Sequence, residues 1–350
     1  MRQRDLSLDI IRIFACLMVV TTHAPMPATE AHSVLLAGIS LFTLPCNALF
    51  FMVSGALLLP TPKTDRKLAP PYEFLKKRLG KVLIPTLLWS LFYIVVRAIN
   101  YNLTIVEIVR SVLSLPFSPQ GHGVLWFMYA LVGLYLLSPI LSAWLKTASE
   151  KEELLYLSLW AITLLYPILH KVVIVNTSIS GILYNFSGYA GFFLLGHYLQ
   201  HYGKRIRMWH SVALYALAIV LPLAIRLAHI DVDISMFMGD SIFGAIHAVF
   251  WWKMLKAFTY YCGKIQSWKS LLAHVSSLTF GIYLMHIFIM RNVLWNVQAI
   301  ASMPQVGQIV VTIVLTFGLS LLFSWLISLT SLGHTLIGYR KAKSLNCNLK

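Results

Sequence analysis

Charged residues are scarce in this chain of 350 residues. Only 11% are charged, against about 25% in a typical soluble domain, while 58% are apolar and the mean hydropathy is +0.75. The longest polar gap between apolar runs extends only from Thr61 to Lys81. This composition excludes an extramembrane catalytic domain and predicts a protein embedded in a lipid bilayer.

The signatures of soluble enzymes are absent as well. The sequence contains no Walker loop, no H-E-x-x-H, no G-x-S-x-G and no Gly-rich dinucleotide turn. Its four cysteines form no C-x-x-C pair and predict neither a disulfide framework nor a metal site. We therefore expect no bound metal and no permanently bound cofactor.

Acidic residues are few, 12 against 28 Lys and Arg, which gives a net charge of +16. In a soluble protein this excess would indicate a nucleic-acid partner. Here the Lys and Arg residues concentrate in alternate loops between apolar segments, as the positive-inside rule requires of cytoplasmic loops. We therefore expect no nucleic-acid partner, and both termini on the cytoplasmic side.

The apolar runs predict an all-α polytopic membrane protein with about ten transmembrane helices. Pro45 and Asn47 predict a break or kink in the second span. Residues 1–335 would form the transmembrane domain and 336–350 a basic cytoplasmic tail. The first run contains Asp9 and Arg12 and lacks a small-x-small cleavage site, so it reads as an uncleaved helix. The expected spans are approximately 8–25, 36–59, 82–99, 124–145, 154–174, 181–200, 209–229, 236–258, 271–296 and 306–330.

Three ionisable residues lie in the first apolar run, LDIIRIFACLMVVTTH. Asp9 and Arg12 are three residues apart, so they share a helix face and can pair. His23 follows Arg12 by eleven positions, which places it near the same face, about 16 Å further along. Ionisable residues in a span are costly and are functional candidates by default, although all three could also lie at the two membrane interfaces.

A basic run, KKRLGKVLIP, precedes the third span and contains Lys77, Arg78 and Lys81. Such a density of cations suits a ligand that carries phosphates. Considered alone, it is more typical of an anchor beside anionic lipid.

Two later stretches carry further candidates, HGVLWFMYALVGLYLLSPIL and SSLTFGIYLMHIFI. The first contains Trp126, and the second places Tyr283 and His286 in one span. Aromatic residues of this kind are often belt or packing residues. A neutral packing role for His286 is as consistent with the pattern as catalysis.

Taken together and in this order, these stretches resemble acyltransferase family 3, a family of integral-membrane acyltransferases. The family pattern of Asp-x-x-Arg followed by Arg-x10-His matches Asp9, Arg12 and His23. FFMVSGALLL resembles the F-F-x-x-S-G-x-x-L segment, and RLGKVLIP resembles an Arg-x-x-Arg before an aliphatic-Pro pair. The second Arg of that pair is Lys81 here, which keeps the charge but loses bidentate phosphate geometry.

The resemblance implies transfer of an acyl group, usually acetyl from acetyl-CoA, to a sugar hydroxyl. It points to the short stand-alone members, which modify surface polysaccharides or their lipid-linked precursors at the bacterial inner membrane. We expect His23 to act as general base or transient acyl carrier, Arg12 to hold CoA or shape the site, and Asp9 to orient Arg12. Lys77, Arg78 and Lys81 would bind CoA phosphates. Trp126, Tyr283 and His286 would contact the substrate.

Two other interpretations also account for ionisable residues inside the membrane. One is a polytopic transporter or flippase for a lipid-linked sugar, although no internal repeat supports it. The other is a non-catalytic sensor or assembly partner. Intact Asp9, Arg12 and His23 favour the enzyme over the sensor.

Overall fold

The computed structural model describes residues 4–25, 34–62, 68–119, 125–171, 173–228, 237, 239–262 and 266–339. The basic tail expected from residue 336 therefore lies outside the described residues from position 340 onward, as does His122 of the third motif. The chain is 80% helical, and its described residues form no strand. This architecture confirms the prediction of an all-α polytopic membrane protein.

The helices follow the predicted apolar runs closely. The second run is broken as expected, since Leu44 and Pro45 separate two helices. The longer helices are α1 (Leu6–His23), α2 (Val34–Thr43), α3 (Cys46–Leu58), α4 (Pro71–Tyr101), α5 (Ile105–Leu113), α6 (Trp126–Leu145), α7 (Glu150–Thr163), α9 (Tyr189–Tyr202), α10 (Met208–Leu227), α11 (Ile242–Cys262), α12 (Gln266–Phe288) and α14 (Gln305–Leu329). The short elements are α8 (Tyr166–Leu169), η1 (Tyr184–Phe186), η2 (Gly203–Arg205), η4 (Ile289–Val293), η5 (Leu294–Asn296), α13 (Gln298–Ala301) and α15 (Gly333–Ile337).

Eight helical segments of the described chain are long and apolar enough to cross a membrane. Two of the predicted spans fall outside this set. Helix α9 has only 14 residues, because turns and the left-handed Gly188 occupy the start of the predicted run. Helix α11 is 21 residues long but carries Lys253 and Lys256.

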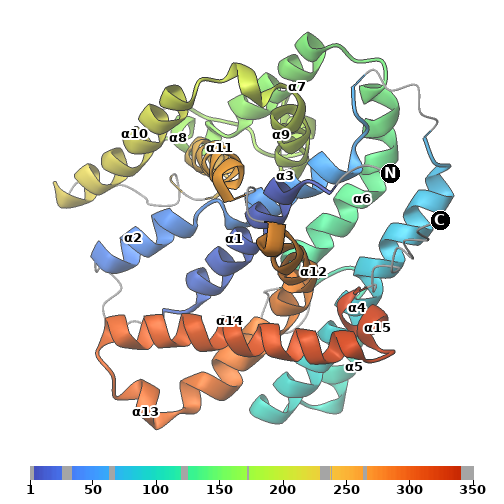
Figure 1. Ribbon diagram of the computed structural model, residues 1–350, viewed down its shortest axis with the longest axis vertical. Helices are drawn as coiled ribbons and strands as arrows, with labels where there is room; N and C mark the ends of the chain where they lie inside the picture. Colours follow the sequence, from blue (N-terminus) through green and yellow to red (C-terminus); the bar gives the residue numbers. More distant parts are fainter. Residues whose placement is uncertain are drawn as a thin grey trace.

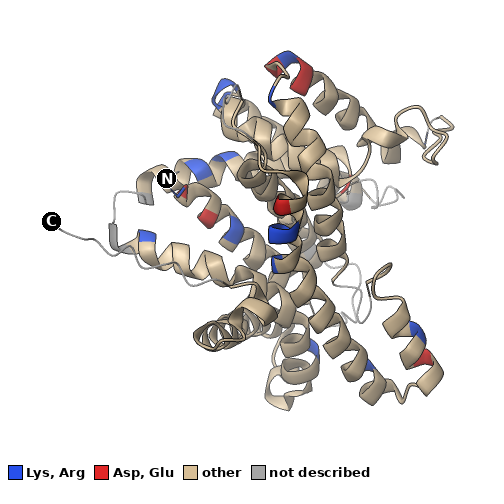
Figure 2. Cartoon of the chain, turned by 90° about the vertical axis from the view of Figure 1, so that its right-hand side faces the viewer, with Lys and Arg blue, Asp and Glu red and all other residues tan. Residues whose placement is uncertain are grey.

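The basic stretch Pro71–Lys81 forms the first turns of α4, a helix of 31 residues that continues through Pro85. It is followed by the short helix α5, which Thr104 and Glu107 cap reciprocally. Figure 2 shows that charged residues gather toward helix ends and that long stretches of ribbon carry none.

Helices α1, α3 and α12 lie at the centre of the molecule, with the other helices around them (Figure 1). Helix α3 packs on α9, while α1 packs on both α12 and α3. The core contains fully buried side chains from all of these helices, including Ile11, Phe51, Phe193 and Leu284. The central position of α1 and α12 matters for function, because these two helices carry most of the candidate residues.

The α3–α9 contact depends on two glycines. A Cβ atom on Gly55 would lie 1.8 Å from the Phe193 carbonyl oxygen, and one on Gly196 would lie 2.0 Å from the Met52 carbonyl oxygen. In both cases the obstacle is backbone of the facing helix, which cannot rotate away. Small residues allow transmembrane helices to approach this closely.

We expect Gly55→Ala and Gly196→Ala each to lower the free energy of unfolding by about 1–3 kcal/mol, because the added methyl group forces α3 and α9 apart. The midpoint of thermal unfolding in detergent measures the effect. Gly133→Ala is the matched control, since nothing lies within 4 Å of its Cβ position. Equal destabilisation by all three substitutions would contradict this account.

Candidate functional site

The cytoplasmic end predicted for α1 is tied to α12 by a buried carboxylate. Asp9 accepts hydrogen bonds from Arg4 Nε at 2.6 Å and Arg4 Nη2 at 2.8 Å, and a third from Ser276 Oγ at 2.7 Å. Arg4 also donates to the carbonyl oxygen of Ala273 at 2.8 Å. The hydrogen bond to Asp9 raises the pKa of Arg4, which lies just before the helix.

This pairing differs from the expected one, in which Asp9 pairs with Arg12. The two residues do share a face of α1, but the segment before the helix brings Arg4 back onto Asp9 in a bidentate arrangement. Arg12 instead lines an interior pocket. Asp9 lies within electrostatic range of Arg12, and its role in orienting Arg12 stays a prediction.

The pocket that Arg12 lines has a volume of about 210 Å³ and lies between α1, α3, α4, α6 and α12. It mixes polar and aromatic side chains from helices far apart in sequence. Its lining includes Arg12, Ser54, Lys81, Tyr135, Ser277 and Tyr283. A few converging polar groups in an otherwise apolar cavity are typical of a site for a small molecule.

The basic run reaches this pocket from the first turns of α4. Lys81 is half-buried and lines the pocket directly. Arg78, one turn earlier, is half-buried within electrostatic range of Tyr135, as Arg12 is. Lys77 is exposed. Arg12 and Lys81 therefore line one cavity, Arg78 lies within electrostatic range of its Tyr135, and Lys77 lies outside it.

Beyond the pocket lies a pair of histidine rings. Tyr283, which lines the pocket, has its ring centroid 5.5 Å from that of His286. The His286 centroid is in turn 5.5 Å from that of His23, at the end of α1. Tyr283, His286 and His23 thus form a continuous line of rings from the pocket to the far end of α1.

The hydrogen bonding of His286 identifies its basic nitrogen. Nδ1 lies 2.6 Å from the carbonyl oxygen of Tyr283, and a carbonyl can only accept, so Nδ1 carries a proton. The ring is 1% exposed. In the neutral ring, Nε2 is therefore a lone-pair acceptor, and it has no hydrogen-bond partner in the described part of the chain.

Trp126 lies apart from this line of rings. Its indole packs against Tyr189 of α9 at 5.4 Å, and it does not line the pocket. It approaches the site only through its neighbour Phe127, which contacts Tyr283 at 5.4 Å. Of the nine residues predicted from sequence, the pocket lining and the ring line include five and leave out Asp9, Lys77, Arg78 and Trp126.

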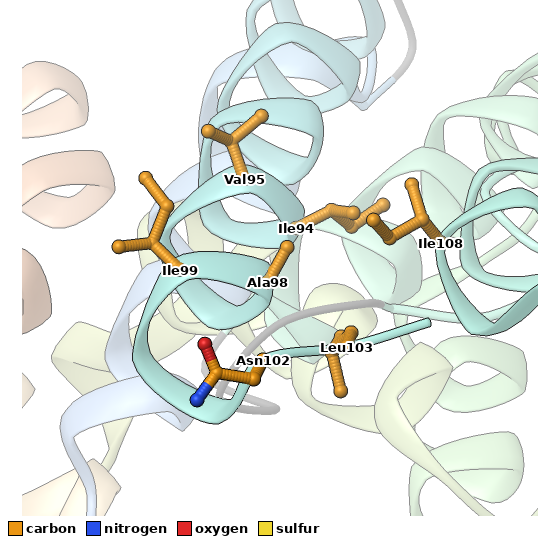
Figure 3. A pocket seen from close by; sticks show the side chains of 7 residues that line it. All are labelled: Ile94, Val95, Ala98, Ile99, Asn102, Leu103 and Ile108. Carbon is orange, nitrogen blue, oxygen red and sulfur yellow. The ribbon is translucent and has the colours of Figure 1, made fainter. Parts of the chain in front are cut away.

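Two of the larger cavities lack such chemistry. One, of about 500 Å³, lies between the end of α4 and α5, where Ile94 and Ile108 point toward each other (Figure 3). Its lining is aliphatic apart from Asn102. The other, of about 660 Å³, lies between α1, α11 and α12 and is lined by apolar side chains only. Neither has a titratable side chain in its lining.

The structure also shows residues that the sequence did not single out. Arg291 and Asn292 lie in η4, a π-helical segment directly after α12. Arg291 is within electrostatic range of both His23 and His286. In the sequence Arg291 is one loop cation among many. The only local signal for it is its position five residues after His286.

A second unpredicted contact is a buried pair between α7 and α9. Glu153 and His197 are 2% and 0% exposed, and Oε1 lies 2.7 Å from Nδ1. The other ring nitrogen, Nε2, lies 2.8 Å from the carbonyl oxygen of Pro60, to which it must donate. The pair therefore joins α7 and α9 to the end of α3, and no local pattern links residues 44 positions apart.

Comparison with known proteins places these observations in a family. The family model described as an acyltransferase domain, acyltransferase family 3, matches residues 5–329, nearly the whole chain. Comparison with curated proteins and with solved structures found no match. The matched range contains the pocket lining except Ile337 and Gly338, the basic turns of α4, and both His23 and His286. The chain therefore belongs to the acyltransferase family 3 of integral-membrane acyltransferases.

Proposed function

We propose that this protein is an O-acyltransferase that moves acetyl from cytoplasmic acetyl-CoA to a hydroxyl of a surface glycan or of its lipid-linked precursor. The observation that carries the proposal is the line from a cation-lined pocket through Tyr283 to the His23–His286 pair. The proposed location is the bacterial inner membrane, where cytoplasmic donor and exported acceptor approach from opposite faces. Membership of an acyltransferase family supports the acyl transfer itself.

The donor would bind at the basic turns of α4. Acetyl-CoA carries several phosphates, which Arg78, Lys81 and the exposed Lys77 suit as charge partners. Arg12 lines the same cavity and would hold the donor further inside it. The acyl end would then point toward Tyr283 and the two histidines, while Trp126 would meet the acceptor from outside the pocket.

The reaction requires removal of one proton. The acceptor hydroxyl oxygen attacks the thioester carbonyl carbon while His23 takes the hydroxyl proton as general base. The tetrahedral intermediate then expels the CoA thiolate, which receives that proton from His23. The products are an ester and free CoA, so atoms and charge balance. An acyl-histidine at His23 is the alternative route to the same products.

We expect His23→Ala to lower acetyl transfer by about 10²–10⁴-fold, the usual contribution of a general base, or to abolish it if His23 carries the acyl group. Transfer of radiolabelled acetyl from acetyl-CoA to glycan in isolated membranes measures the rate. The variant should insert and accumulate normally, because the His23 ring is only half-buried at a helix end. His210→Ala, an exposed histidine on α10, is the control. Undiminished transfer by His23→Ala would sink the assignment.

A second expectation concerns the donor. Arg78→Ala and Lys81→Ala should each weaken acetyl-CoA binding by about tenfold or more, since a hydrogen bond to a charged group contributes about 1.5–3 kcal/mol. Titration calorimetry on the detergent-solubilised protein reports the dissociation constant. Lys151→Ala removes an exposed cation on α7, outside the pocket, and should leave binding unchanged. If binding survives both pocket substitutions, the basic turns serve only as a topology anchor.

The same assay separates the enzyme from a transporter. A flippase for a lipid-linked sugar requires no acyl-CoA, so it would transfer no labelled acetyl to glycan. Acetyl incorporation that depends on His23 is specific to the enzyme.

A further inference from the structure

Directly after His286, the backbone departs from α-helical geometry. Helix α12 ends at Phe288, and residues Ile289–Val293 form the π-helical segment η4. Single π turns are rare and occur frequently at functional sites. Tyr93 of α4 binds the last turns of α12 before this segment. Its hydroxyl donates a hydrogen bond to the carbonyl oxygen of Leu284 at 2.8 Å.

The π turn and the residues next to it carry buried polar atoms that the described part of the chain does not satisfy. Arg291 Nε, Asn292 Oδ1 and Trp295 Nε1 are buried and, like His286 Nε2, have no hydrogen-bond partner in the described chain. His286, whose ring centroid is 5.5 Å from that of His23, is 1% exposed. Buried polar groups normally have partners, and each one without a partner costs about 1–3 kcal/mol.

These atoms form a complementary set. Arg291 Nε and Trp295 Nε1 are donors, whereas Asn292 Oδ1 and the neutral His286 Nε2 are acceptors. A hydroxyl group both donates and accepts, so neighbouring hydroxyls on one ring can engage both kinds of atom. A ligand with several hydroxyl groups fits this set better than an apolar chain.

The position of the guanidinium group is fixed. The Arg291 guanidinium carbon lies 5.7 Å from the centroid of the Trp295 ring, in a cation–π contact that restrains it. It also lies within electrostatic range of His23 and His286. Its planar fork is therefore restrained within electrostatic range of the two rings to which the acetyl group would be delivered.

The π turn and the donor pocket also lie on opposite sides of the His23–His286 pair. Lys81, Arg12 and Tyr283 line the donor pocket, while η4 continues the chain beyond His286, away from Ser276 and Ser277 at the pocket. His23 is likewise at the opposite end of α1 from Asp9. Donor and π turn therefore approach the histidine pair from opposite directions.

We propose that Arg291 and Asn292 form the acceptor subsite, binding two neighbouring hydroxyl groups of a sugar ring so that a third hydroxyl meets the His23–His286 pair. The ligand class is a carbohydrate with a vicinal diol. The inference rests on the proposed acyl-transfer function and adds the residues that select the acceptor.

The test is a split in Michaelis constants, measured on the full-length protein in nanodiscs with acetyl-CoA. The acceptor probe is the glycolipid fraction extracted from membranes of the source cells. Arg291→Gln and Asn292→Ala should each raise the apparent KM for glycolipid at least tenfold, and they should leave the KM for acetyl-CoA within about twofold. Arg110→Gln, which removes an exposed arginine of α5, should change neither constant.

Arg291→Lys tests the fork separately, because it keeps the charge and removes the planar pair of donors. Arg291→Lys should therefore show a raised KM for glycolipid, as Arg291→Gln does. A wild-type KM in Arg291→Lys, no change in Arg291→Gln and Asn292→Ala, or an equal rise in both Michaelis constants would each overturn the subsite.

A direct binding measurement distinguishes failure of the acceptor subsite from failure of the proposed acetyl transfer. If the wild type transfers no acetyl at all, the proposed function fails. The subsite is then tested by retention of the tritium-labelled glycolipid fraction on the protein. Arg291→Gln should lose at least tenfold in retention, and retention equal to the wild type would overturn the subsite.

Discussion

The contact between α1 and α12 is the constraint on which the candidate site depends. At one end, Asp9 holds Arg4 and Ser276, and Arg4 reaches the Ala273 carbonyl. At the other end, the rings of His23 and His286 lie 5.5 Å apart. Two hydrogen bonds cross between the helices, from Ser276 to Asp9 and from Arg4 to the Ala273 carbonyl, and a slip of one turn would break both, so they fix the register. The His23–His286 pair lies at the other end of the same two helices, so the distance between its rings depends on this register.

Under the proposed function, this arrangement would let two substrates meet inside a membrane without an open channel. Cations from α1 and α4 lie at the pocket, aromatic rings continue inward from it, and polar atoms without partners among the described residues follow after His286 in the chain. Each part suits a different chemistry: phosphates at the cations, a thioester and a hydroxyl at the rings, and a polyol at the π turn. The low local dielectric strengthens each hydrogen bond and ion pair that forms, and it raises the free-energy cost of buried polar groups without a partner.

Sequence patterns predicted the helices and much of the site, for identifiable reasons. Apolar runs locate spans because a bilayer tolerates only helices with satisfied backbones, and Pro45 broke the second span as expected. Spacing along one helix placed Asp9, Arg12 and His23, yet it could not give their partners. Asp9 binds Arg4, which lies outside the helix, and His23 meets His286 through packing of α1 on α12. The π turn at Arg291 likewise depends on tertiary contacts, and the resemblance to a family carried no information about it.

The central claim is that this membrane protein adds an acyl group to a glycan. Mass spectrometry of surface glycans from otherwise identical cells, with and without the protein, tests it most directly. The account predicts that glycans from cells with the protein are heavier by one acetyl unit on the modified sugar, and that this increment disappears when the protein is removed. Identical glycan masses in the two samples would contradict it.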